Sequence, residues 1–503
     1  MRFKSAHLFL LLSVILHSSI ATGLALALAS TTANATSPAS RTCTMLQAQM
    51  GSEVVQFSGA EYNASASNAW SLFNAQNKPT CIVFPQEASH VQTAMAAIFH
   101  NKIHYAVQAG GHTAMTGWNT VQDGILFFFS HMKNVSYNAT SDTITLQPGI
   151  HWGEALTQLQ PLSVAPLGGR LGDVGTGLLL GGGLSYLSGE HGFSADSYVA
   201  LDVVLVTGQL VTATATNQYA DLFRALKGGA NRFGIVTRYE VQAVHTGDAS
   251  EKQFFGGLIL YPNSSAEALI NATQRYVSKV NNPRASILMA FSNSVNGSEI
   301  TSTHILTLFF RGPSLPPAIF GEFLEIPSIM KQLSALSYVD ANNILGAGAD
   351  RGFGQLFGAS AFNGTVDQYR NAFQKWNEYT ESIKDSLFGT VLAFTPIQQS
   401  QVQAGRARGS NIIDPPMGNY AAVQVQTQMQ NGLLTISDQV QAARQLLFQS
   451  MPRTPGLPLY INECDASQNV FETYGRFEEL KKTYAKYDPT RFNVQFTDGP
   501  IGL

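Results

Sequence analysis

Hydrophobic positions in the first half of the chain alternate between short apolar runs and helical spacing. Val91, Met95 and Ile98 recur at helical spacing and predict a helix over 87–100. Apolar or alternating segments predict strands over 81–84, 104–108, 124–129, 143–147, 198–206 and 234–241. Because helices and strands do not recur in regular pairs, we expect a mixed layer of both and not a barrel of repeated units.

The pattern changes near residue 245, which is a candidate domain boundary. Beyond it, amphipathic helices are predicted over 264–281, 365–384 and 436–449. Longer strands are predicted over 286–291, 303–310, 387–394 and 420–427. This order predicts an α+β unit in which helices cover one face of an antiparallel sheet. The tail predicts a strand at 459–462, then a helix and a short strand.

Composition narrows the class of protein. With 503 residues, the chain is long enough for about three domain-sized units. Its formal net charge is −3, and we find no run of Lys and Arg, so we expect no nucleic-acid partner. The patterns that mark P-loops, serine hydrolases and zinc sites are missing from the sequence, so no metal is expected.

The first residues have the pattern of a secretory signal. Arg2 and Lys4 precede an apolar run over 8–16, and small residues suited to cleavage follow, so residues 1–29 are predicted as a signal peptide. A signal anchor is the alternative, but polar residues over 17–23 interrupt the apolar stretch. We therefore expect a secreted protein with no membrane association after cleavage.

Sequons and cysteines agree with the secretory pathway. Eight Asn-x-Ser/Thr sequons predict N-glycans at Asn34, Asn63, Asn134, Asn138, Asn263, Asn271, Asn296 and Asn363. In an oxidising compartment, Cys43 and Cys81 are expected to form a disulfide, with Cys464 left free. Three unpaired buried thiols are the alternative.

Two glycine-dense runs, over 108–118 and 168–183, are the main candidates for chemistry. Such loops expose backbone N–H groups that bind anions such as a pyrophosphate. The second run fails the dinucleotide fingerprint G-x-G-x-x-G, because Leu180 stands where the third glycine is required and no strand precedes the run. The runs therefore indicate a phosphate-binding backbone without a nicotinamide signature.

Several motifs in the same order resemble the berberine-bridge-enzyme type of FAD-linked oxidoreductases, in particular fungal secreted members. These motifs are Gly110-Gly-His112, Gly168 to Gly183, His191 to Asp196, Asp221 to Val236, Tyr460-Ile-Asn462 and Tyr474-Gly475. The resemblance implies a two-part FAD-binding domain of the vanillyl-alcohol-oxidase type, also called PCMH-type, at 30–245 with its core at about 77–245. It also implies a substrate-binding α+β domain at 246–455 and a return to the FAD-binding domain over 456–503.

The resemblance implies a covalent bond from His112 to the 8α-methyl carbon of FAD. It also implies that FAD contacts Gly110, Gly111, Thr113, Gly117, Val174, Gly175, Gly177, Gly182, Asp196, Gly234, Val236 and Asn462. Some relatives have a second flavin bond from a cysteine upstream of Val174, and this chain has none there. Tyr460 matches the family's active-site tyrosine and is the candidate for handling the substrate proton, with a core tyrosine as the alternative. Glu463 and Cys464 depart from the family pattern, which usually has an aromatic residue after Asn462.

The implied activity is an oxidase that passes hydride from a small-molecule alcohol, such as a polyketide-type metabolite, to FAD and then to O2. An oligosaccharide oxidase is a second possibility. A non-catalytic secreted binding protein on a flavin fold is a third. The sequence does not identify the substrate, because the substrate pocket is built from side chains scattered along the chain.

Overall fold

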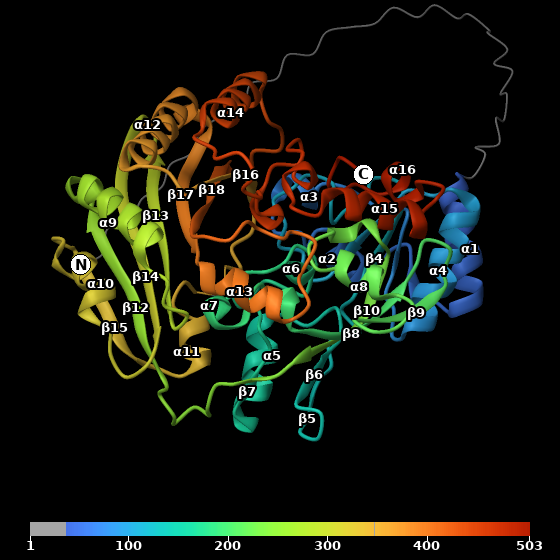
Figure 1. The fold of residues 1–503 in the computed structure, drawn as a ribbon. Helices are drawn as coiled ribbons and strands as arrows, with labels where there is room; N and C mark the ends of the chain where they lie inside the picture. Colours follow the sequence, from blue (N-terminus) through green and yellow to red (C-terminus); the bar gives the residue numbers. More distant parts are fainter. Residues whose placement is uncertain (1–36, 347) are drawn as a thin grey trace, which may run out of the picture. The chain divides into compact units, whose positions relative to one another are not determined.

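Sheets of four, five and seven strands organise residues 37–346 and 348–503, which this computed structural model describes (Figure 1). The first sheet has the order β1-β2-β4-β3, and β2, β4 and β3 run parallel. Its strands are β1 (Val55–Gln56), β2 (Cys81–Val83), β3 (Tyr105–Gln108) and β4 (Ile125–Phe128). Its helices are α1 (Pro38–Met50), α2 (Ala60–Ala66), α3 (Leu72–Ala75) and α4 (Ala88–Asn101). Parallel strands buried on both faces explain the continuous apolar runs in the sequence.

The second sheet is antiparallel, with the order β5-β6-β10-β8-β9. Its strands are β5 (Val135–Asn138), β6 (Thr143–Leu146), β8 (Tyr198–Val204), β9 (Leu210–Thr214) and β10 (Ile235–Gln242), and β7 (Val164–Ala165) pairs separately with β11 (Val244–His245). The accompanying helices are α5 (Trp152–Leu159), α6 (Gly177–Leu180), α7 (Ser188–His191) and α8 (Ala220–Ala225). The first glycine run lies between β3 and β4, and the second lies between β7 and β8 and includes α6.

The third sheet is antiparallel throughout, with the order β15-β12-β14-β13-β17-β18-β16. Its strands are β12 (Phe254–Pro262), β13 (Ala285–Asn296), β14 (Glu299–Arg311), β15 (Met330–Leu336), β16 (Phe353–Phe362), β17 (Leu387–Ile397) and β18 (Tyr420–Asn431). The helices are α9 (Ala266–Lys279), α10 (Pro317–Glu325), α11 (Tyr338–Asn342), α12 (Val366–Ile383), α13 (Gln399–Ala407) and α14 (Asp438–Ser450). Helices α9 and α12 pack on one face of this sheet (Figure 1), which confirms the predicted α+β arrangement. The domain boundary near 245 stays a prediction, because residues 38–503 form one compact unit.

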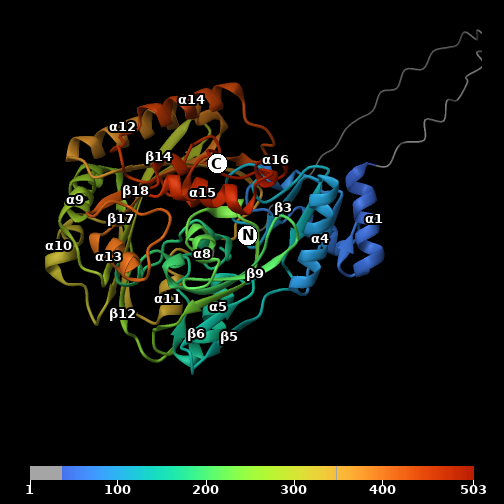
Figure 2. The same ribbon diagram turned by 45° about the vertical axis from the view of Figure 1, so that its right-hand side comes forward.

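The C-terminal segment packs back on the first half of the chain, with α15 (Phe477–Tyr487) beside α8 (Figure 2), followed by α16 (Phe492–Phe496). Arg232 holds the tail by donating hydrogen bonds to the carbonyl oxygens of Asn493, Thr497 and Pro500. The predicted strand at 459–462 is wrong. The chain turns on itself there in a 3-10 helix, Ile461–Glu463, because the Glu463 N–H bonds to the Tyr460 carbonyl at 3.0 Å.

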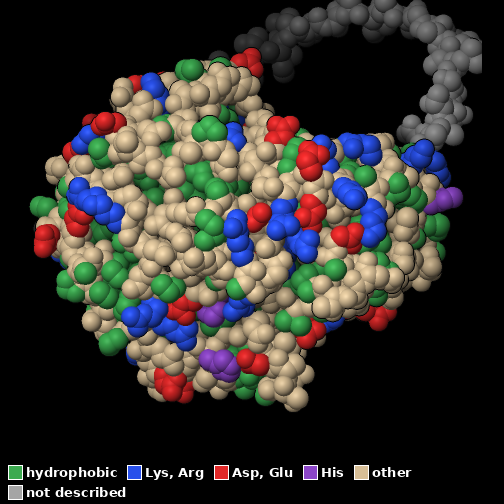
Figure 3. All heavy atoms as spheres, in the orientation of Figure 1, with side chains coloured by type: hydrophobic (Ala, Val, Ile, Leu, Met, Phe, Trp, Pro, Cys, Tyr) green, Lys and Arg blue, Asp and Glu red, His purple; other side chains and the backbone are tan. Residues whose placement is uncertain are grey.

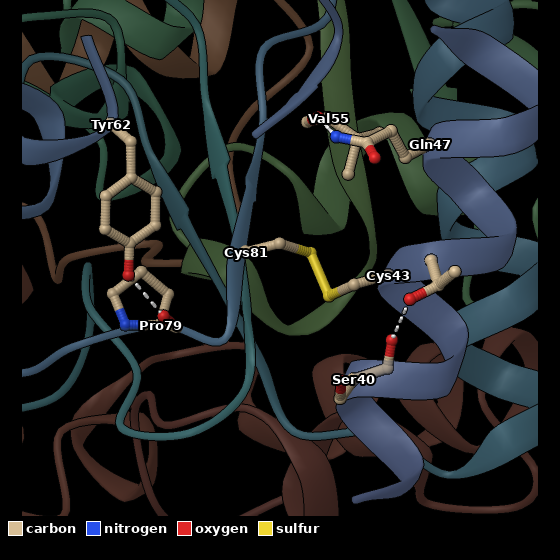
Figure 4. The surroundings of a disulfide bond; sticks show 8 residues. Ser40, Cys43, Gln47, Val55, Tyr62, Pro79 and Cys81 are labelled. Carbon is tan, nitrogen blue, oxygen red and sulfur yellow. Dashed lines mark hydrogen bonds between the residues drawn. A yellow bond between two sulfur atoms is a disulfide. The ribbon is translucent and has the colours of Figure 1, made fainter. Parts of the chain in front are cut away.

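A disulfide joins Cys43 on α1 to Cys81 on β2 (Figure 4), with 6.1 Å between their Cα atoms. Beside it, the Gln47 amide of α1 donates a 2.8 Å hydrogen bond to the Val55 carbonyl. Cys464 is free and buried, so both parts of the cysteine prediction agree with the structure.

The predicted signal peptide, residues 1–29, and the sequon at Asn34 lie outside the described residues. Across residues 37–346 and 348–503, no helix has both the length and the apolar character needed to cross a membrane. On the face drawn in Figure 3, Lys and Arg side chains are interspersed with Asp and Glu side chains.

Candidate active site

The two glycine runs meet backbone to backbone. A Cβ atom on Gly110 would lie 2.5 Å from the nitrogen of Gly175, and one on Gly175 would lie 2.6 Å from the nitrogen of Gly110. No real side chain tolerates such contacts, so only glycine permits this approach. The two runs therefore converge in space.

A cavity of about 550 Å³ opens where these runs, the seven-stranded sheet and the C-terminal segment come together. Most of the predicted site residues line it: Gly110, Gly111, His112, Thr113, Val174, Gly175, Gly177, Gly234, Val236, Tyr460 and Asn462. Asn462 fixes the C-terminal segment against the second glycine run, because its amide donates to the Leu178 carbonyl at 2.9 Å.

Three predicted residues lie outside the wall of the cavity and have packing roles. Gly117 has φ +85° and donates its N–H to the Asn74 side chain at 2.8 Å. Gly182 has φ +98°, so its turn requires the left-handed conformation that glycine adopts freely. Asp196 is buried, where it accepts hydrogen bonds from the Phe193 N–H and the Asn411 amide. These residues shape the loops and do not face the cavity.

His112 is held as a neutral, oriented imidazole. Its ring stacks on Trp70 with 4.3 Å between centroids, and Nε2 lies 2.9 Å from the Gly348 carbonyl oxygen. Burial lowers the pKa of His112, more than the Gly348 carbonyl raises it. Because a carbonyl only accepts, Nε2 carries the proton of the neutral ring and Nδ1 keeps its lone pair.

A carboxylate and a guanidinium also line the cavity. Arg170, on the second glycine run, lies 3.6 Å from Glu463 and donates to the Thr395 hydroxyl at 3.2 Å. Burial raises the pKa of Glu463, and the Arg170 charge opposes that rise. Neither carboxylate oxygen of Glu463 accepts a hydrogen bond from the residues that the structure describes. It can therefore accept one from a molecule in the cavity.

Tyr460 stands beside this pair and keeps its proton. Its hydroxyl accepts a 2.9 Å hydrogen bond from the Asn462 amide. Burial raises the pKa of Tyr460 strongly, and the Glu463 charge raises it further. The phenol is therefore a hydrogen-bond donor at neutral pH, while Glu463 is the group beside it that can be ionised.

The seven-stranded sheet contributes an amide-rich wall. Gln424, Gln426 and Gln428 alternate along β18 and face the cavity, whereas the residues between them point into the core. Gln426 donates to the Gln355 side chain at 3.1 Å. The amides of Gln424 and Gln428 make no hydrogen bond with other described residues.

Sequence reasoning did not identify these glutamines, nor Trp70 and Gly348, as parts of the site. The alternation of glutamine over 424–430 is a signal that one strand face is polar. Trp70 and Gly348 reach His112 from distant segments and leave no local signal. Glu463 was visible only as a departure from the family pattern.

The residues present suit a flavin dinucleotide. Gly177 lines the cavity and a Cβ there would meet no atom within 4 Å, so the absent side chain leaves open space beside the backbone. The Asn119 amide oxygen is buried in the wall without a hydrogen-bond partner in the described parts of the chain. Glycine backbone suits a pyrophosphate, and unpaired polar atoms suit the polar groups of the ligand. The glycine runs and His112 would hold the cofactor.

Comparisons with known proteins agree with this geometry. A family model described as an FAD binding domain matches residues 79–214. The chain is 30% identical to an uncharacterised FAD-linked oxidoreductase of Arthroderma benhamiae, over 90% of this chain and 93% of that one.

Solved structures show the same fold. The carbohydrate oxidase of Microdochium nivale is 20% identical, with a TM-score of 0.72 over 92% of this chain and 100% of that one. The glucooligosaccharide oxidase of Acremonium strictum, described as carrying a 6-S-cysteinyl, 8α-N1-histidyl FAD, is 18% identical, with the same TM-score and coverage.

Proposed function

Because this chain belongs to the family of FAD-linked oxidoreductases, we propose that it oxidises a small-molecule alcohol of polyketide type, using O2 as the acceptor and FAD bound covalently through His112. The observation that carries the proposal is one cavity lined by His112, the glycine backbone and the Glu463–Arg170 pair. Bound FAD supplies a two-electron acceptor for hydride. Family membership argues against the non-catalytic alternative.

The surroundings of His112 support covalent attachment. Its Nδ1 lone pair is available because Nε2 donates to the Gly348 carbonyl. In forming the bond, the flavin methyl carbon loses one hydrogen and the imidazole loses its Nε2 proton. Two protons and two electrons are released in total, and O2 takes them up as H2O2. A cofactor tethered in this way cannot be lost to a surrounding medium that contains no flavin.

Glu463 is the proposed acceptor of the substrate's hydroxyl proton. Hydride loss from an alcohol carbon requires that this proton leave to a base within hydrogen-bond reach. Both oxygens of Glu463 are free to accept, and Arg170 favours the ionised carboxylate. Tyr460 is not available as a base at neutral pH, because its raised pKa keeps the phenol protonated. Its proposed role is to orient the substrate oxygen.

The glutamine side chains of β18 indicate which kind of substrate the cavity would bind. Unpaired amides at Gln424 and Gln428 favour a substrate with several hydroxyl or carbonyl oxygens over a purely apolar one. Oxygenated polyketides and oligosaccharides both meet this requirement. The carbohydrate oxidases among the structural neighbours give specific support to the second class.

One screen tests the activity and separates these substrate classes. Purified protein would be offered oxygenated polyketide alcohols in one arm and oligosaccharides in the other, with peroxide release measured in air. Bleaching of the flavin absorbance without air would detect hydride transfer independently of O2. We expect both signals with members of the first arm. A protein whose flavin no compound bleaches would contradict the proposal.

We also propose that the protein is secreted and N-glycosylated. None of the described sequon asparagines is buried: Asn63, Asn134, Asn138, Asn263, Asn271, Asn296 and Asn363. By contrast, Asn74, Asn411 and Asn493 are buried, and none of them is in a sequon. Expression in a secretory host should give extracellular protein whose mass falls on treatment with an endoglycosidase. Retention inside the cell without a mass change would contradict this proposal.

A further inference from the structure

His112 is held between a ring and a carbonyl that come from two distant parts of the chain. The Trp70 ring lies nearly parallel to the imidazole, with an angle of 14° between the planes. Gly348 lies in the loop between α11 and β16, and its carbonyl oxygen accepts a hydrogen bond from Nε2 at 2.9 Å. Neither group belongs to the glycine motif that contains His112. Orientation of this imidazole therefore depends on contacts outside its own loop.

Arg351 connects the two segments that hold the ring. Its guanidinium donates to the Asn68 carbonyl at 3.2 Å and to the Ala349 carbonyl at 2.7 Å. Asn68 lies two residues before Trp70, and Ala349 directly follows Gly348. A third donor of Arg351 reaches the Asp173 carboxylate at 2.9 Å. One planar side chain therefore joins both holding segments to the second glycine run, which lysine cannot reproduce.

We propose that Trp70, the Gly348 carbonyl and Arg351 form a clamp that orients His112 for covalent attachment to FAD, an inference that rests on the proposed function. Stacking on Trp70 fixes the plane of the imidazole. The Gly348 carbonyl keeps Nδ1 unprotonated and stabilises the positive charge that develops on the ring as the Nδ1–carbon bond forms. Arg351 sets the spacing between ring and carbonyl, so it is a positioning residue.

The reaction that the clamp assists is the balanced one given above. Nδ1 of His112 bonds to the flavin methyl carbon, that carbon loses one hydrogen and Nε2 loses its proton. The two electrons pass to O2, which leaves as H2O2. Because Nε2 must release its proton during this step, a carbonyl that already accepts from Nε2 lies at the atom where the charge changes.

Arg370, on α12, provides a matched control for Arg351. Its guanidinium also donates three hydrogen bonds, to the Glu267 and Asp367 carboxylates, but it does not line the cavity. Replacing either arginine by lysine keeps the positive charge and removes the planar fork of donors. Only the change at Arg351 loosens the segments that hold His112.

The test measures the rate at which the flavin-free full-length protein attaches added FAD in air. Attached flavin is measured as fluorescence that stays with acid-precipitated protein, and total bound FAD and thermal unfolding are recorded for every variant. We expect Trp70→Ala and Arg351→Lys to slow attachment by about 100-fold, as misplacement of a reacting group does. Trp70→Phe, which keeps a stacking ring, and Arg370→Lys should attach FAD at close to the wild-type rate.

The outcomes distinguish failure of the clamp from failure of the covalent bond itself. Wild-type attachment rates in Trp70→Ala and Arg351→Lys would overturn the clamp, as would equal slowing in Arg370→Lys. If Trp70→Ala does not fold, Arg351→Lys carries the test, because this guanidinium is partly exposed and lies outside the core. If the wild type attaches no FAD and matches His112→Ala, the covalent bond in the proposed function fails and the clamp fails with it. Slowing confined to Trp70→Ala and Arg351→Lys supports both the covalent bond and the clamp.

Discussion

The two walls of the cavity differ in what the chain exposes on them: backbone on one side and long side chains on the other. On one side, Gly110 and Gly175 bring bare backbone into contact, and both line the cavity. On the other side, the seven-stranded sheet presents long side chains from β18, and its backbone is fully engaged in pairing with β17 and β16. The first wall suits a ligand that is the same in every relative, because backbone cannot vary. The second suits a ligand that differs between relatives, because each side chain can be exchanged without disturbing the sheet.

This difference separates two kinds of substitution. Changes at Gly110 and Gly175 act on the fold and on cofactor binding together, because any atom added there meets the backbone of the other glycine run. Changes in the side-chain wall act on the substrate alone. The predictions below test that separation, in order from the largest expected effect to the smallest.

Replacing His112 by alanine should abolish covalent flavin completely. Acid-precipitated wild-type protein should be yellow and fluorescent, whereas precipitated His112→Ala protein should be colourless. The variant should still bind FAD reversibly, because the glycine backbone remains. A precipitate of His112→Ala that retains flavin would show attachment at another residue.

Replacing Glu463 by glutamine should lower kcat/KM by about 100-fold or more, which is the usual size of a lost general base. The sign of the pH dependence follows from the raised pKa of Glu463. The carboxylate must be ionised to accept a proton, so wild-type kcat/KM should rise as pH increases through that raised pKa. Stopped-flow bleaching of the flavin across pH would measure this limb, which the variant should lack.

The exposed Glu472→Gln, in the same C-terminal segment, is the control and should keep the wild-type profile. A pH limb that persists in Glu463→Gln would assign the base elsewhere.

Replacing Gly175 by alanine should destabilise the fold by about 1–3 kcal/mol, the usual cost of overpacking, and should weaken FAD binding. The added methyl group would lie 2.6 Å from the backbone nitrogen of Gly110. Gly172→Ala in the same loop is the control, because its nearest new contact is an ordinary 3.5 Å. Thermal unfolding with and without FAD measures both effects. Equal stability of the two variants would contradict the close approach of the runs.

Replacing Gln424 by leucine should raise KM by about 3- to 10-fold, the value of one hydrogen bond, and leave thermal stability unchanged. No described residue loses a hydrogen bond in this variant, because the amide has no protein partner. Gln430→Leu on the same strand is the control, since Gln430 bonds to the Asp385 carbonyl and lies outside the cavity. A fall in stability for Gln424→Leu would show that the two walls are not separable in this way.

The same contrast explains how much the sequence could predict. The glycine runs and His112 could be identified because a close backbone approach excludes other residue types and so leaves a mark in the sequence. Four strands of the third sheet were also predicted, over 286–291, 303–310, 387–394 and 420–427, because alternation reports which side chains share a face. The polar alternation of Gln424, Gln426 and Gln428 was present in the same segment, but period alone does not say what that face meets.

Other features depend on contacts that no local pattern records. Arg351 bonds to Asn68 across 283 residues of sequence, so neither segment indicates the other. The segment at 459–462 has the apolar composition of a strand, yet a turn closes on Tyr460 and places Glu463 in the cavity. In both cases the outcome was decided by tertiary contacts.

The cavity is lined by residues as far apart as Trp70 and Thr497, and Arg232 holds the segment that contains Thr497 in place. A ribosome therefore has to translate almost to the end of this sequence before the binding site is closed. We therefore expect FAD to bind only after the C-terminal segment has been synthesised and has packed against Arg232. Whether the protein can bind its cofactor thus depends on whether its C-terminal segment is present and packed.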